Sequence, residues 1–317
     1  MFSQLMSMVL TEDFLFSIIR ITAPILFAAL GAVVAEKAGV TNIGLEGTMM
    51  ISALLGMLVS YWTQSWVLGV LMAVLVGILL GLMMGFFNLK LKTDIILAGI
   101  AVNMLGGGTI FLLNMLVHMK GNTGSLSSAN ILIPTINIPL IDRIPVLRSL
   151  LSGHSVLTYV AFLSVLLVWI LLYRTSLGLN IRAVGENANA ASSVGVSVNK
   201  IRYIAIGISG AFAGLGGAFM SMYYSQGWNS GMVAGRGFIA LAAQAMGRGE
   251  PVGAMLSSLL FGLAQALKNK VTGLTGLASY NYLVASIPYI VTIVGLVIYA
   301  ASTIRRAKRH RKASEEK

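Results

Sequence analysis

The sequence predicts an all-α polytopic membrane protein with about nine transmembrane helices, within a range of roughly eight to ten. Hydrophobic residues make up 57% of the 317 residues, charged residues make up only 10%, and the mean hydropathy is +0.86. A soluble chain of this length would need far more polar surface to cover its core. The apolar segments follow one another so closely that we expect one transmembrane domain at 1–304 and a basic tail at 305–317.

The individual helices follow from apolar segments near the length of roughly 20 residues that a spanning helix needs. These segments are 14–35, 42–61, 66–88, 94–117, 155–173, 201–224, 236–247, 251–269 and 282–302. The seventh is too short to span, and we interpret it as half of a broken helix. Matching segments one to four with six to nine gives antiparallel pairs, which predicts an inverted repeat.

The basic residues predict the orientation in the cytoplasmic membrane. The tail is the most basic stretch and is therefore expected inside, which places the N-terminus outside. The polar connection 174–200 then lies inside, and the proline-containing connection 118–154 lies outside. The net charge of +12 collects beside membrane segments, so it indicates contact with membrane lipid and not with nucleic acid. Four basic residues count against this orientation: Arg143, Arg148, Lys268 and Lys270.

Enzyme chemistry is not expected. The chain has no cysteine and only three histidines, which lie far apart, so neither a thiolate site nor a metal cluster is predicted. It also contains no Gly-Lys dipeptide and therefore no Walker A loop. We predict a transport subunit without a cofactor of its own, and any ATP that drives it must bind to another polypeptide.

Two polar residues stand at the start of the second apolar segment. In a helix starting near Asn42, that residue and Glu46 lie one turn apart on one face and are expected to face protein or a water-filled path. A carboxylate in the first helical turn is also stabilised by the helix dipole and can pair with Lys37. The sequence does not distinguish a structural role of Glu46 from a direct role in the translocation path.

Four further residues are candidates for the translocation path. Asn103 and Asn114 are nearly three helical turns apart, and the glycines at 106–108 between them can split the helix. In the short seventh segment, Phe238 could stack on a solute and Gln244 could donate hydrogen bonds to it. Packing and interhelical hydrogen bonds are the alternative roles.

Three stretches resemble a known family. EKAGVTNIGLEGTMM at 36–50, SLGLNIRAVGENANAASSVGVSVNKIR at 176–202 and GRGFIALAAQAMGRGEP at 235–251 resemble segments of ABC importer permeases for ribose, branched-chain amino acids and nucleosides. The resemblance covers roughly 20–302 and is nearest the nucleoside branch, which works with a lipoprotein of the basic membrane protein type. It implies a type II-like importer permease in a bacterial cell membrane, moving nucleosides by alternating access.

The resemblance also implies partners. A second permease subunit, often non-identical, pairs with this one, two ATP-binding cassette proteins bind ATP and Mg²⁺ beneath them, and an extracellular solute-binding lipoprotein delivers the solute. The segment 174–200 would dock on the ATPase through a short helix near 186–193. The small alanine side chains of this helix would allow close contact with the ATPase. The residues expected to take part in this coupling are Gly185, Glu186, Asn187, Ala190, Ala191 and Gly195.

Two alternatives accompany this reading. Within the same class, the solute could be a ribose-like sugar or a branched-chain amino acid, because solute choice rests largely on the binding protein. In a different class, an ion-coupled secondary transporter would use an intramembrane acid, and Glu46 is the main candidate. Dependence on a partner ATPase or on an ion gradient separates the two classes.

Overall fold

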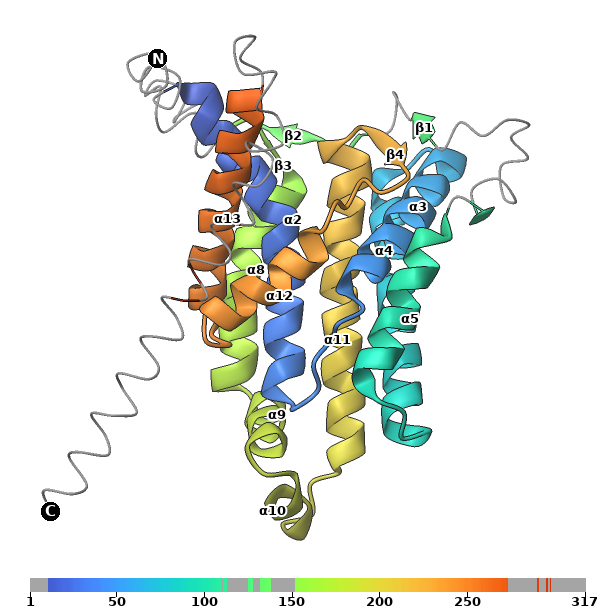
Figure 1. Cartoon of the computed structure of the whole chain (residues 1–317), viewed down its shortest axis with the longest axis vertical. Helices are drawn as coiled ribbons and strands as arrows, with labels where there is room; N and C mark the ends of the chain where they lie inside the picture. The colour runs from blue at the N-terminus through green and yellow to red at the C-terminus, as the bar shows by residue number, and fades with distance from the viewer. Residues whose placement is uncertain are drawn as a thin grey trace, which may run out of the picture.

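Two long helices, α2 (Glu12–Lys37) and α11 (Val198–Phe219), pack against each other in the middle of the molecule (Figure 1). This computed structural model describes residues 11–109, 111–112, 125–127, 132–137 and 152–272, with single positions at 290, 295 and 297. Figure 1 shows a group of helices on each side of the central pair. Their bounds are α3 (Leu45–Thr63), α4 (Trp66–Gly85) and α5 (Ile95–Gly107) on one side, and α8 (Val156–Arg174) and α13 (Pro251–Thr272) on the other.

The predicted segments up to residue 269 each coincide with a helix. Six helices among the described residues are long and apolar enough to cross a membrane. The predicted segment 94–117 is interrupted: α5 ends at Gly107, within the glycine triplet that the sequence marked as a weak point. The segment 282–302 and the tail 305–317 lie outside the described residues apart from three single positions, so the count of nine and the inverted repeat stay predictions.

Hydropathy alone does not separate buried helices from lipid-facing ones. Most of α2 is buried although it is apolar on all sides, because α8, α11, α12 and α13 surround it. In α4, by contrast, Leu71, Leu75 and Leu79 are each at least half exposed, and they recur every fourth residue. That spacing forms one apolar stripe, which is the face expected to contact lipid acyl chains.

Small residues bring the backbones of α4 and α11 together. Gly210 lies against the carbonyl of Gly77, and Gly214 lies against the carbonyl of Ala73. A Cβ atom at either α11 position would collide with these backbone atoms, so only glycine allows the approach. The glycine-rich stretch at 207–217 thus supplies the small residues that bring the two backbones into contact.

Four short strands and two π-helical turns complete the described fold, and the all-α prediction did not include the strands. β1 (Ser125–Ser127) pairs antiparallel with β4 (Gly227–Asn229), which places Leu126 opposite the fully buried Trp228. β2 (Thr135–Ile136) pairs in the same way with β3 (His154–Ser155). The rest of the predicted external loop 118–154 lies mostly outside the described residues. Two π-helical turns extend the long helices: η1 (Phe86–Lys90) after α4 and η2 (Met220–Tyr224) after α11.

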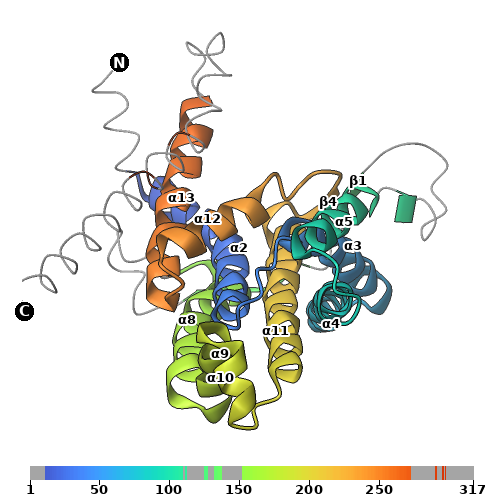
Figure 2. The ribbon, with the colours of Figure 1, turned by 60° about the horizontal axis from the view of Figure 1, so that its bottom comes forward.

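Three further α-helices are short. α9 (Ser176–Glu186) and α10 (Ala188–Ser193) lie at one end, at the bottom of Figure 1, and Figure 2 brings this end forward. α12 (Arg236–Met246) crosses between α2 and α3 and turns directly into α13. The sequence predicted this seventh helix as too short to span, and its 11 residues confirm that.

Candidate functional site

The carboxylate of Glu46 binds the N-terminus of α12. Its two oxygens accept hydrogen bonds from the backbone N–H groups of Gly235, at 2.8 Å, and of Gly237, at 2.7 Å. The first N–H groups of a helix have no partner within the helix, and they carry partial positive charge. A carboxylate from the first turn of α3 therefore caps a second helix that lies about 190 residues later in the chain.

The chain at this cap has the local features that the contact requires. Gly235 has a φ of 80°, the left-handed conformation that glycine adopts without strain. A Cβ atom on Gly237 would lie 2.6 Å from the Cα atom of Glu46, so any side chain there would push the two helices apart. Arg236, between the two donors, is only 7% exposed and brings a positive charge close to the carboxylate.

The two asparagines near α3 tie helices together. Asn42 precedes α3, donates to the Ser209 hydroxyl on α11 at 3.0 Å and accepts from the backbone N–H of Gly44. It therefore does not share a helical face with Glu46 as predicted, because α3 begins three residues after Asn42. Asn103 on α5 accepts from the backbone N–H of Gly47 and donates to the carbonyl of Ile43. Both side-chain amides are thus occupied by protein groups: Asn42 joins the start of α3 to α11, and Asn103 joins it to α5.

The structure does not bring the other path candidates together. Phe238 is half exposed, whereas Gln244 is 8% exposed on another face of α12. The amide of Gln244 points toward the turn at Gly249 near the end of α2, so it does not share a platform with Phe238. Asn114 lies outside the described residues. Among these path candidates in the described residues, Phe238 is the one with an exposed side chain in the single chain.

The segment expected to couple to an ATPase forms a compact pair of helices. A short helix is present, but it begins at Ala188, two residues later than predicted, because Asn187 caps it by accepting from the backbone N–H of Ala190. Glu186 instead ends α9. Gly195 turns the chain after α10 with a φ of 86°.

The surface of this segment is uneven. Ala190 is exposed, while Ala191 is 4% exposed and faces inward. Gly185 packs against the carbonyl of Lys37 at the end of α2, so α9 touches the bundle there. The exposed part is consequently the tip formed by α10 and the turn after it.

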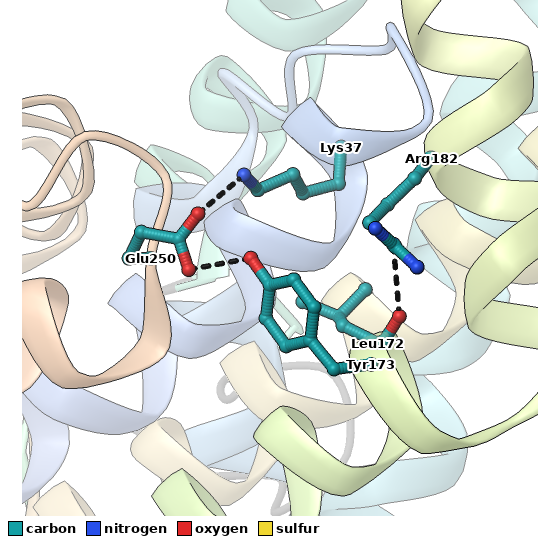
Figure 3. Close-up of polar contacts among 5 residues, drawn as sticks. All are labelled: Lys37, Leu172, Tyr173, Arg182 and Glu250. Atoms are coloured by element: carbon teal, nitrogen blue, oxygen red, sulfur yellow. Dashed lines mark hydrogen bonds and ion pairs between the residues drawn. The ribbon is translucent and has the colours of Figure 1, made fainter.

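A polar junction joins this segment to the α12–α13 turn (Figure 3). Glu250 in the turn accepts hydrogen bonds from Lys37 of α2 at 2.8 Å and from the Tyr173 hydroxyl of α8 at 2.5 Å. Arg182 of α9 places its guanidinium carbon 4.9 Å from the Tyr173 ring centroid and donates to the carbonyl of Leu172. One carboxylate thus holds the ends of two long helices, and a cation–π contact adds α9.

Comparison with known families places this architecture. The model of the family described as branched-chain amino acid transport system / permease component matches residues 14–302. The chain belongs to this permease family. The match includes the α3 start, the α9–α10 segment and α12, the three stretches on which the resemblance was based. No solved structure matches the permease.

Individual relatives of the permease are similar over most of their length. The nucleoside ABC transporter permease protein NupC of Lactococcus lactis subsp. cremoris is 31% identical, covering 89% of this chain and 90% of the relative. The guanosine ABC transporter permease protein NupQ of Bacillus subtilis is 33% identical, covering 86% and 88%. The putative glucose ABC transporter permease protein TsgC13 of Haloferax volcanii is also 33% identical, covering 77% and 73%.

Sequence reasoning missed several residues of the permease. Tyr173 and Glu250 are not close in sequence to each other or to Lys37, and no motif marks them as partners. Val194, directly after α10, is 79% exposed. Single apolar residues are common on protein surfaces and exposure cannot be read from the sequence, so no sequence signal marked Val194.

The Glu250 junction predicts a pH-dependent stability. Burial raises the pKa of the Glu250 carboxyl, but hydrogen bonds from Lys37 and Tyr173 outweigh burial, so the pKa lies below its usual value of 4.5. Such a group stabilises the fold above the unfolded pKa, and the contribution is lost as the pH falls through the lowered folded pKa. In thermal melts, Glu250→Gln should unfold at a lower temperature than the unmodified permease at pH 7. The difference should shrink below about pH 4.5.

The exposed carboxylate of Glu186 provides the matched control for this prediction. Glu186→Gln should melt like the unmodified permease at both pH values, because no hydrogen bond to its carboxylate is formed within the described residues. A difference between Glu250→Gln and the unmodified permease that stayed constant from pH 7 to pH 4 would contradict the ionised junction.

Proposed function

We propose that this chain is the membrane-spanning permease subunit of an ATP-driven nucleoside importer. One observation carries the proposal: relatives named for nucleoside and guanosine transport, NupC and NupQ, align with the chain at 31% and 33% identity over most of both lengths. The short capped helix α12 and the protruding α9–α10 segment fit such a subunit. In this proposal the chain binds no ATP itself, and ATP with Mg²⁺ belongs to a partner ATPase.

The proposal assigns a role to each part of the bundle. The tip of α10, with its flanking turns, docks on the ATPase at the cytoplasmic face; the residues proposed for this coupling are Gly185, Glu186, Asn187, Ala190, Ala191 and Gly195. The opposite end, with the β1–β4 pair, faces outward and receives a solute-binding lipoprotein. A second, non-identical permease subunit completes the pathway, and alternating access moves the solute through it.

In the proposed function, α12 is the element of the site that moves during transport. Glu46 of α3 binds the N-terminus of α12, and Glu250, after its C-terminus, is bound by Lys37 of α2 and Tyr173 of α8, so each end of this short helix is tied to another element. Phe238 on its exposed face is positioned to stack on a purine or pyrimidine ring. Asn42 and Asn103 act as positioning residues for the start of α3, and Glu46 acts as a gating residue and not as a proton carrier.

Uptake in reconstituted vesicles tests this function. Vesicles that contain this chain, its second permease, the ATPase and the binding protein should accumulate radiolabelled guanosine when ATP is supplied to the ATPase side. Collapse of ion gradients by an ionophore should leave the initial rate unchanged. The matched control replaces the Walker A lysine of the ATPase, which should abolish uptake. Uptake by this chain alone that an ionophore abolishes would instead identify an ion-coupled transporter.

A sugar is the second candidate solute. The relative TsgC13, named as a putative glucose permease, is as similar to this chain as NupQ at 33% identity, over a smaller share of both chains. Unlabelled glucose or ribose in excess should leave guanosine uptake unchanged if the solute is a nucleoside. Competition by a sugar, without competition by other nucleosides, would favour this second candidate.

A further inference from the structure

A polar pocket is lined by residues of α2, η2 and α13. The start of α2 and the end of α13 lie at the end of the bundle away from α9 and α10 (Figure 1). Its volume is about 290 Å³. The polar side chains that line it are those of Ser17, Arg20, Tyr224, Asn269 and Lys270. The residues that bind the ATPase or the solute in the proposed function are not part of it.

Arg20 is held in this pocket from one side. A terminal nitrogen of its guanidinium donates to the carbonyl of Tyr224 at 2.7 Å. Its guanidinium carbon lies 4.9 Å from the Tyr224 ring centroid and 5.7 Å from that of Tyr223. The Nε atom is buried and has no hydrogen-bond partner among the residues that the structure describes. A guanidinium carries five N–H donors, so these contacts leave donors free for a ligand.

The charge of this pocket is not balanced by nearby acids. Among the described residues, no carboxylate lies within salt-bridge distance of Arg20 or of Lys270. The acids on the same helix, Glu12 and Asp13, precede Arg20 by at least seven residues and are exposed. Cations near the hydrocarbon region of a membrane are costly without a partner, and an anion in the pocket would reduce this cost.

The depth and the donors of the pocket fit a phosphate group. At a rise of about 1.5 Å per residue, Arg20 lies about 12 Å inside the start of α2, whereas Lys270 is only two residues from the end of α13. Ser17 lines the pocket one turn closer to the helix start, so the opening extends from Arg20 toward the membrane surface. The Ser17 hydroxyl already donates to the carbonyl of Asp13, so the guanidinium, the ammonium and the Asn269 amide supply the donors that phosphate oxygens accept.

We propose that the Arg20–Lys270 pocket binds a phosphate group, supplied either by the head group of an anionic phospholipid or by a free phosphate anion. This site explains the position of Lys270, which the rule that basic residues lie inside does not explain. Lys270 was one of four basic residues placed on the side where few are expected, and a ligand that needs a cation there accounts for it.

Native mass spectrometry on the purified permease complex tests the site. The complex is titrated with phosphatidylglycerol, with phosphatidylcholine as the zwitterionic reference. The complex should retain phosphatidylglycerol more tightly, and Lys270→Gln should weaken that binding about tenfold, because one charge-assisted hydrogen bond is lost. Arg20→Lys should weaken it less than Arg20→Gln, since the charge is kept.

The matched control is Lys268→Gln, which lies on the same last turns of α13 but does not line the pocket. Both lysines contribute similarly to the helix dipole and to surface charge, so only pocket binding distinguishes them. Equal loss of phosphatidylglycerol in the two variants, or equal binding of the two lipids, would overturn the proposal.

The source of the phosphate follows from a competition arm. Millimolar inorganic phosphate that displaces phosphatidylglycerol, and that raises the melting temperature of the complex but not of Lys270→Gln, assigns the pocket to free phosphate. Phosphatidylglycerol binding that persists in phosphate assigns it to the lipid. Melting of each variant without ligand shows whether it is folded, which keeps the comparison valid if one substitution destabilises α13.

Discussion

Replacing Glu46 with alanine should reduce nucleoside uptake at least about tenfold and lower the melting temperature of the permease. The carboxylate makes two hydrogen bonds to the start of α12. Hydrogen bonds to charged groups contribute about 1.5–3 kcal/mol each, and about 1.4 kcal/mol corresponds to a factor of ten. Initial uptake rates and thermal melts on the same preparations measure the two effects.

The glutamine variant separates a capping role from a proton-carrying role. Glu46→Gln keeps one oxygen for one of the two N–H groups, so a cap predicts losses in uptake and stability that are both smaller than in Glu46→Ala. A proton carrier predicts complete loss of uptake with unchanged melting. Glu12→Gln, an exposed acid at the start of α2, serves as the control and should behave like the unmodified permease. Normal uptake by Glu46→Ala would refute the proposal that transport depends on the hydrogen bonds between Glu46 and the N-terminus of α12.

Placing a charge at the tip of α10 should release the ATPase. Val194→Asp and Ala190→Asp introduce a charge where the surface is exposed, 79% in the case of Val194, so folding should be unaffected. At a docking surface, each substitution removes an apolar contact with the ATPase. It also introduces a charge that must lose its water when the ATPase binds, which costs free energy. Co-purification of the ATPase should fall at least about tenfold, and uptake should fall with it.

The choice of position decides whether this experiment is informative. Ala191 belongs to the same helix but is 4% exposed, so a charge there would disturb packing and could not report on docking. Gln64→Asp, an exposed position after α3 and outside α9 and α10, is the control for added charge. Normal co-purification and uptake with both Val194→Asp and Ala190→Asp would exclude the α10 tip as the docking surface.

Much of the fold follows from the sequence because helix formation in a membrane depends on local composition. The apolar segments up to residue 269 predicted the positions of the helices, and the glycines at 106–108 predicted the interruption at the end of α5. The short length of the segment at 236–247 also identified α12 as a helix that does not span.

The site was less predictable because its contacts join distant parts of the chain. The sequence marked Glu46 as costly to expose, yet nothing near it indicates that Gly235 and Gly237 are its partners. Asn42 was predicted one turn from Glu46 on a helix, but the chain remains irregular until Leu45. Phe238 and Gln244 were grouped by proximity in sequence, whereas their six-residue spacing turns them to different faces of α12.

The burial of α2 has a consequence for how the protein is made. This helix is synthesised before the helices that enclose it, α8, α11, α12 and α13, which follow more than a hundred residues later. During translation its small and aromatic surfaces must remain in contact with lipid or with the insertion machinery, and they can assemble only after the second half has been inserted. Interrupted synthesis would therefore leave an N-terminal fragment that is inserted in the bilayer yet unable to complete its own packing.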